Sequence, residues 1–420
     1  MKYLVPSIFL VLGLLIVSMG LTKRETGGTF DVQSFAELPV QSGGRILPID
    51  SVARNTLRVL QGRTAVSTAD GGKIGPDQWI LDLAFKPVVA DAYPVFRIDH
   101  PEVLGLFGWE QTDRKYFSWD ELEPHFQLIQ QQSQQAPDEK DQRTTFEESI
   151  IKLTRALMLY NRVATSFDPG PDFAVWPEIA GPGSDEFAKQ ERGEQPDQQI
   201  LQPFLVLAQY YMRVANNADL GIVPPAPGVD SKDWLNVGEG MLRTIRTGEL
   251  DPVVAGYGRL AQAYNGDDPA AFATEAAALK TELSTHYNAK RVAFEQFFNH
   301  LQPFYYTSWI YVLIFLLVAA SWLAWPETLQ RSAFWLLILA LIVHTFGLAA
   351  RMYIQERPPV TNLYSSAIFV GWVAILLGVV LEPIYKNGVG SFVASLIGFC
   401  TLIIAHNLAL TGDTLEMMQA

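Results

Sequence analysis

The chain has a single cysteine, Cys400, and only six histidines among 420 residues. One cysteine cannot build an intrachain disulfide framework or the thiolate pairs of a structural zinc site. The histidines show no His-x-x-x-His spacing, and no nucleophile motif containing serine or cysteine accompanies them. The sequence therefore gives no indication of a zinc enzyme or a hydrolase.

The chain also has fewer basic residues than acidic ones. The chain has 31 Lys and Arg against 44 Asp and Glu, which gives a formal net charge of −13 at pH 7. Proteins that bind nucleic acid neutralise phosphates with clustered Lys and Arg. The composition therefore argues against nucleic acid as a partner.

Long apolar runs are missing from residues 22–303, which also carry most of the charge. Elsewhere five runs approach the roughly 18 residues that cross a bilayer as a helix. They are Tyr3–Leu21, Tyr306–Trp325, Ala333–Ala350, Ala367–Leu381 and Phe392–Leu410. The sequence thus predicts an integral membrane protein that contacts lipid through five spans.

The runs divide the chain into three expected parts of a mainly α-helical protein. Residues 1–22 form an N-terminal transmembrane anchor or signal, and Lys23-Arg24 without a small-residue cleavage pattern favours an anchor. Residues 23–303 form a mainly helical extracytoplasmic domain, and residues 304–420 form four transmembrane helices. With the domain outside, the loop between the third and fourth spans also lies outside.

Two capping signals mark helix starts in the 23–303 domain. Ser118 and Glu121 have the spacing of a capping box. Asp50 or Ser51 is placed to cap a helix over Val52–Gln61.

Periodicity predicts further elements of this domain. Thr145–Phe167 has an apolar face at helical spacing, and Asp230–Arg246 also reads as a helix. Proline, glycine and charge dominate Asp168–Gln199, which predicts a loop. A helix that begins at Pro269 is expected to run on to His300 and almost into the membrane.

The third and fourth spans and the segment between them hold most of the candidate site residues. His344 lies inside a predicted span, where ionisable groups are costly and usually functional. Pro358-Pro359 stiffens the connecting segment and fixes the place of Asn362 and Tyr364 beside the membrane. This segment is expected to present side chains.

The run Arg-Pro-Pro-Val-Thr-Asn-Leu-Tyr-Ser-Ser from Arg357 to Ser366, which enters the helix at Ala367–Trp372, resembles the membrane core of cytochrome c assembly proteins of the CcsA/ResC type. A second similar stretch is Ile404–Leu410, containing His406 and followed by Gly412-Asp413-Thr414. The resemblance covers about the last quarter of the chain. The family's external tryptophan-rich segment is not found, so we expect this chain to be truncated before it.

The resemblance implies a role in cytochrome c biogenesis in a bacterial plasma membrane. Such proteins bring haem to the outer face, where it is attached to the Cys-x-x-Cys-His motif of apocytochrome c. The chain would then be at most part of a cytochrome c haem lyase or synthase. A ResB-type partner, or a further part of the same protein, is expected to complete it.

Together with their chemistry, this resemblance assigns roles to the candidate residues. His344 and His406 are expected to bind haem iron as axial ligands. Arg351 or Arg357 is expected to hold a propionate, with Asn362 and Tyr364 in the same haem-binding group.

Other interpretations of these residues, without haem, also fit the sequence. Each histidine can instead be a buried residue hydrogen-bonded to a neighbouring helix, and the arginines can anchor the membrane interface. On that interpretation the protein is a membrane-anchored binding or scaffold protein without haem. A third hypothesis is a transporter subunit whose histidines relay protons. No catalytic residue is identified.

Overall fold

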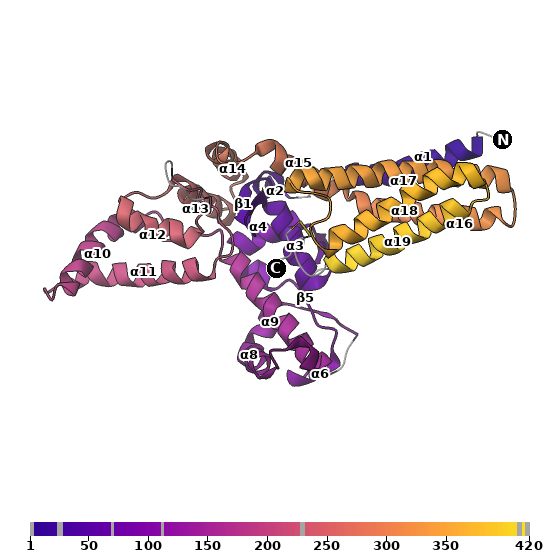
Figure 1. Ribbon diagram of the computed structural model, residues 1–420. Helices are drawn as coiled ribbons and strands as arrows, with labels where there is room; N and C mark the ends of the chain where they lie inside the picture. Colours follow the sequence, from indigo (N-terminus) through magenta and orange to yellow (C-terminus); the bar gives the residue numbers. More distant parts are fainter. Residues whose placement is uncertain are drawn as a thin grey trace. The chain divides into compact units, whose positions relative to one another are not determined.

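The computed structural model describes residues 4–22, 28–68, 71–110, 113–226, 232–409 and 414–415. The protein is mainly α-helical, as predicted (Figure 1). It divides into two compact units, which we call the membrane unit (residues 1–25 and 293–420) and the central unit (residues 26–292).

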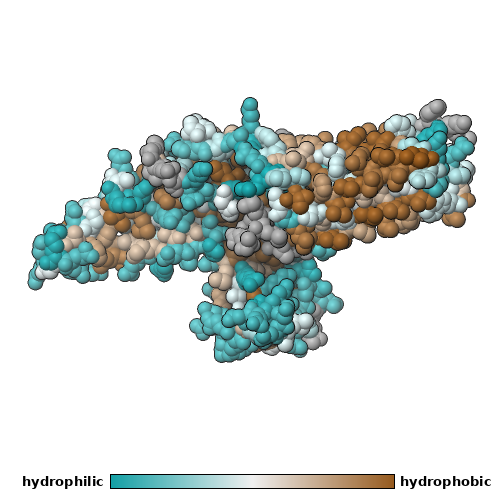
Figure 2. Space-filling view, viewed as in Figure 1, coloured by the Kyte–Doolittle hydropathy of each residue, from teal (hydrophilic) through white to brown (hydrophobic). Residues whose placement is uncertain are grey.

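Five helices among the described residues are long and apolar enough to cross a membrane, which confirms the five predicted spans. Four of them are α16 (Pro303–Ser321), α17 (Pro326–Gln355), α18 (Leu363–Tyr385) and α19 (Val389–Leu408). The fifth, α1 (Leu4–Ser18), continues as the short 3-10 helix η1 (Met19–Leu21). Hydrophobic residues cover the surface of these helices on the face shown in Figure 2, as contact with lipid requires. The chain is therefore an integral membrane protein by helix length and composition.

The spans of the membrane unit pack as an antiparallel bundle. Helices α18 and α19 form a tight hairpin, α16 packs against α17 and α19, and α1 packs against α17 and α16. Because successive spans alternate in direction, α16 and α18 begin at the same end of the bundle at which α17 and α19 finish. We call this end the motif end, since the Arg357–Ser366 motif lies there.

The central unit contains most of the remaining elements. Its helices are α2 (Val32–Ala36), α3 (Ile49–Gln61), α4 (Pro76–Phe85), α5 (Pro87–Asp91), α6 (Pro101–Leu106), α7 (Trp119–Leu122), η2 (Glu123–His125), α8 (Phe126–Gln135), η3 (Lys140–Gln142), α9 (Thr145–Ala164), α10 (Trp176–Glu191), α11 (Gln198–Asn217), α12 (Val237–Thr247), α13 (Pro252–Asn265) and α14 (Pro269–Leu283). Helix α15 (Ala289–Leu301) begins in the central unit and ends in the membrane unit. Three antiparallel pairs of short strands are described: β1 (Pro39–Ser42) with β2 (Arg45–Pro48), β3 (Val66–Ser67) with β4 (Lys73–Ile74), and β5 (Phe96–Arg97) with β6 (Tyr116–Phe117).

Strong local sequence signals in the central unit predict its helices correctly. Ser118 Oγ accepts from the Glu121 backbone N–H at 3.3 Å, and the Glu121 carboxylate accepts from the Ser118 N–H at 2.9 Å. This is the predicted capping box. The predicted apolar face of α9 is buried, and its members are Ile150, Leu153, Leu157 and Tyr160.

The prediction of a loop over Asp168–Gln199 is wrong, because α10 occupies its middle. Buried Trp176 stacks on Phe204 of α11 with ring centroids 5.9 Å apart, and its indole N–H donates to the Met241 carbonyl at 2.7 Å. Packing of this one aromatic outweighs the poor helix propensity of the surrounding proline and glycine residues.

The single long helix expected from Pro269 to His300 is also wrong. Helix α14 ends at Leu283, and Asn288 then accepts from the Arg291 N–H at 3.2 Å just ahead of the next helix, α15. Gln302 has a positive φ of 45° and separates α15 from α16. The break between Leu283 and Ala289 therefore divides the expected helix into two, α14 and α15.

Other expected boundaries also need correction. Helix α3 begins at Ile49, so Asp50 and Ser51 lie in its first turn and do not cap it. Helix α12 begins at Val237, capped by Asn236, whereas the predicted start at Asp230 lies outside the described residues. Residues 410–413 of the second resembling stretch also lie outside them.

Candidate functional site at the motif end

The Arg357–Ser366 motif forms a tightly bonded entry to α18. Asn362 caps the helix by accepting from the Ser365 N–H at 2.8 Å. Ser365 Oγ in turn accepts from the backbone N–H groups of Thr361 and Asn362, both at 2.9 Å. Asn362 is therefore fixed by its own helix start, and Tyr364 follows it in the first turn.

Arg351, in the last turns of α17, joins this entry to the segment that follows α19. Its guanidinium lies 4.5 Å from the centroid of the Tyr364 ring and donates to the Thr414 carbonyl at 2.6 Å and the Thr414 hydroxyl at 3.2 Å. The Asn362 amide donates to the same carbonyl at 3.0 Å, and the Gln355 amide donates to the Leu415 carbonyl at 2.8 Å. We call Arg351, Gln355, Asn362, Tyr364 and Thr414 the Arg351 cluster.

The two predicted arginines therefore differ in their surroundings. Arg351 is only 3% exposed and is held between Tyr364 and Thr414. Arg357 is exposed, and within the described part of the chain it makes no hydrogen bond or ion pair. Of the two, Arg357 has its planar donor face available for a carboxylate ligand.

The two predicted histidines are also separated. His344 is completely buried, with Nδ1 2.8 Å from the Tyr311 hydroxyl and Nε2 3.1 Å from the Ile368 carbonyl oxygen. His406 lies on an exposed position of the last turn of α19. The structure thus brings Arg351, Asn362 and Tyr364 together, but it does not bring His344 and His406 into one environment.

Sequence reasoning missed a buried acid at the opposite end of the bundle. Glu382, 7% exposed, accepts from the backbone N–H of Gly388 at 2.8 Å and of Ser391 at 2.9 Å. It therefore satisfies two backbone donors at the start of α19. Its place near the end of an apolar span is the sequence signal that could have identified it.

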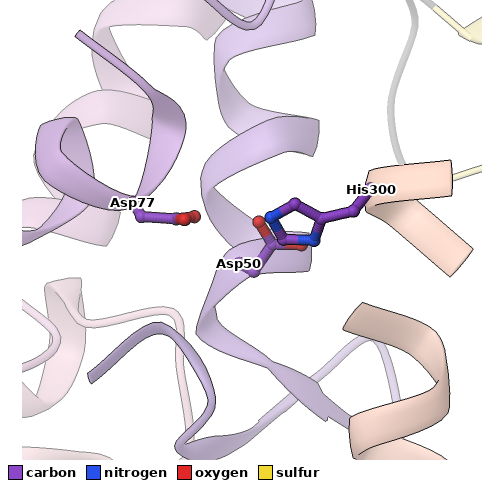
Figure 3. A group of neighbouring side chains, drawn as sticks. All are labelled: Asp50, Asp77 and His300. Atoms are coloured by element: carbon purple, nitrogen blue, oxygen red, sulfur yellow. The ribbon is translucent and has the colours of Figure 1, made fainter. Parts of the chain in front are cut away.

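The central unit holds a buried carboxyl pair that was also missed. Asp50 is 0% and Asp77 is 8% exposed, and they offer oxygen atoms within 4.8 Å of each other (Figure 3). Burial, reinforced by the charge of Asp50 and a hydrogen bond to it, raises the pKa of Asp77 from its usual 3.8 to about 8. Arg54 Nε lies 2.7 Å from Asp50 Oδ1, so the guanidinium balances negative charge on this pair.

Comparison with known proteins gives a partial similarity. No family model matches the chain. Over 102 residues, 24% of this chain, it is 30% identical to Protein HemX of Bacillus subtilis (strain 168). The matched stretch covers 37% of that protein's length. The chain is therefore a multi-span membrane protein with a weak, partial relationship to Protein HemX.

Proposed function

We propose that the chain acts in cytochrome c biogenesis, binding haem at the motif end and presenting it for attachment to apocytochrome c. The observation that carries this proposal is the meeting of the two stretches that resemble cytochrome c assembly proteins. Asn362 of the first stretch and Thr414 of the second share a hydrogen bond, and Arg351 binds Thr414 beside them. The segments that resemble one family thus form one local structure.

The motif end also lies where the chain passes between the two units. A methyl group on Gly20, which follows α1, would lie 2.3 Å from the Leu301 carbonyl oxygen, which precedes α16. Both connections to residues 26–292 therefore leave the membrane unit from the end that carries the Arg351 cluster. We propose that this end is the extracytoplasmic one, on the same side as the exported domain.

Exposed groups at the motif end fit the chemistry of haem. The imidazole of His406 can bind iron, and the guanidinium of Arg357 can bind a propionate in its planar fork. The Arg351 cluster holds the backbone around them in place. When bound, haem supplies the vinyl groups to which the cysteine thiols of apocytochrome c add.

A ResB-type partner, or a further part of the same protein, would supply the remaining groups for attachment. The proton-relay alternative gains no support, because His344 Nε2 faces a carbonyl oxygen, which has no proton to pass on. The alternative of a scaffold without haem is decided by experiment.

The test is the absorbance of the full chain expressed in haem-replete cells and purified in detergent. We expect a Soret band, and we expect His406→Ala to lower the haem content about tenfold or more, equivalent to ~1.4 kcal/mol of binding free energy. His286→Ala is the matched control, because His286 is an exposed histidine of the central unit. A colourless wild-type protein would overturn the proposal in favour of the scaffold.

A further inference from the structure

The surroundings of His344 determine which of its ring nitrogens carries the proton. The Ile368 carbonyl oxygen can only accept a hydrogen bond, so Nε2, 3.1 Å away, must be the N–H donor. A neutral imidazole has one N–H, which leaves Nδ1 as an acceptor. The Tyr311 hydroxyl, 2.8 Å from Nδ1, must therefore donate to it.

From this geometry we infer that Tyr311 is a positioning residue that holds His344 as the Nε2–H tautomer and keeps it from binding iron. Of the two membrane histidines, His406 is then the one that binds haem, and this assignment rests on the function proposed above. His344 joins three helices instead, since Tyr311 belongs to α16, His344 to α17 and Ile368 to α18.

The packing around the pair is close on several sides. His344 and Tyr311 are both 0% exposed, and the Phe304 ring meets the imidazole edge to face with centroids 5.5 Å apart. A methyl group on Gly371 would lie 2.2 Å from Thr401 Oγ1 and 3.6 Å from His344 Cε1. The helices around His344 are packed so closely that even a methyl group does not fit at Gly371. A porphyrin ring would need far more space beside the imidazole.

Iron binding by His344 would undo this arrangement. Binding through Nδ1 would displace the Tyr311 hydroxyl into a buried, apolar setting without its acceptor. Binding through Nε2 would remove the proton that satisfies the Ile368 carbonyl. Either change leaves a buried polar group unpaired in a membrane interior, where water cannot replace the lost partner.

His344→Gln separates the two roles of this residue. A glutamine side chain can accept from Tyr311 through its oxygen and donate to the Ile368 carbonyl through its amide, but it has no imidazole. His344→Leu removes both hydrogen bonds. We expect the Gln variant to keep its Soret band within about twofold of wild type, and the Leu variant to melt ~4 °C lower or more.

Tyr311→Phe supplies the second half of the test. It should melt at a lower temperature than the wild type. The double variant Tyr311→Phe/His344→Leu should lose less stability than the sum of the two single losses, because both substitutions remove the same hydrogen bond. A His344→Gln protein that melts like wild type but has lost its haem would overturn the inference, since only the imidazole is then missing.

A tautomer measurement keeps this outcome distinct from failure of the proposed function. In the full chain labelled with ¹⁵N-histidine, His344 should give the signal of an Nε2-protonated ring, and Tyr311→Phe should move that signal. This result is expected whether or not the wild type binds haem. A ring protonated at Nδ1 would contradict the assignment.

Discussion

The membrane unit and the central unit both bury ionisable side chains, but they pair them differently. In the membrane unit, Arg351 donates to a backbone carbonyl of the segment that follows α19, and Glu382 accepts from backbone N–H groups at the start of α19. In the central unit, Asp50, Asp77 and Arg54 interact with one another through their side chains. Backbone groups within a bilayer have no water to bond, and polar side chains at the ends of spans can satisfy those that the helices leave unpaired.

The largest effect is expected from breaking this pattern at Glu382. Glu382→Leu leaves the N–H groups of Gly388 and Ser391 without their acceptor, which should lower the free energy of unfolding by about 3 kcal/mol or more. Thermal unfolding in detergent measures it. Glu327→Leu, at an exposed position in the first turn of α17, should cost only ~0.5 kcal/mol. Equal melting temperatures for the two variants would contradict the comparison.

Arg351→Met should have the next largest effect. It removes the bonds to Thr414 and the contact with Tyr364, so we expect a loss of about 2 kcal/mol and faster proteolysis near residues 414–415. Arg357→Met is the matched control, because the exposed Arg357 should leave stability unchanged and weaken only haem binding. If Arg357→Met destabilises the protein as much as Arg351→Met, the two arginines do not have separate roles.

Asp77→Asn tests the carboxyl pair of the central unit. Because the folded pKa of Asp77 is raised from 3.8 to about 8, its contribution to stability is full below pH 3.8 and is lost as the pH rises toward 8. The variant should lose that pH dependence and gain about 1–2 kcal/mol at pH 8, since asparagine has no carboxyl group to ionise.

Tryptophan fluorescence of the full chain during denaturation, between pH 4 and pH 8, measures this change. Asp113→Asn, an exposed substitution of the same kind, should leave the pH profile as in wild type. A steeper loss of stability with rising pH in Asp77→Asn would show that the sign is wrong.

Ser118→Ala should have the smallest effect. Loss of the side-chain half of the capping box should cost ~1 kcal/mol. Ser149→Ala, in the interior of α9, should stay within ~0.5 kcal/mol of wild type. Denaturant midpoints of the full chain compare the two, and an unchanged midpoint for Ser118→Ala would show that the cap does not limit stability.

The sequence predicted features that depend on neighbours along the chain. The five spans and the Ser118 capping box follow from local hydropathy and spacing, and both are confirmed. Helix α10 was missed because its stability comes from the contact of Trp176 with Phe204 and Met241, which no local pattern reveals. The break before α15 was missed because only a short segment, residues 284–288, separates two stretches of helical sequence.

The candidate site was predictable in part. Arg351, Asn362 and Tyr364 were identified together, and the structure places them together. Their common partner Thr414 was not foreseen, because 63 residues separate it from Arg351. The burial of His344 against Tyr311 depends on how three spans pack, and hydropathy gives only the existence of those spans.

The most direct test of the central claim is a haem titration of the purified full chain carrying the same substitution at each membrane histidine. We expect His406→Gln to lose the ferrous spectrum of histidine-ligated haem and to bind haem about tenfold more weakly or worse, a difference of ~1.4 kcal/mol. His344→Gln should give the wild-type spectrum and affinity. The opposite pattern, with haem lost in His344→Gln and retained in His406→Gln, would contradict the account.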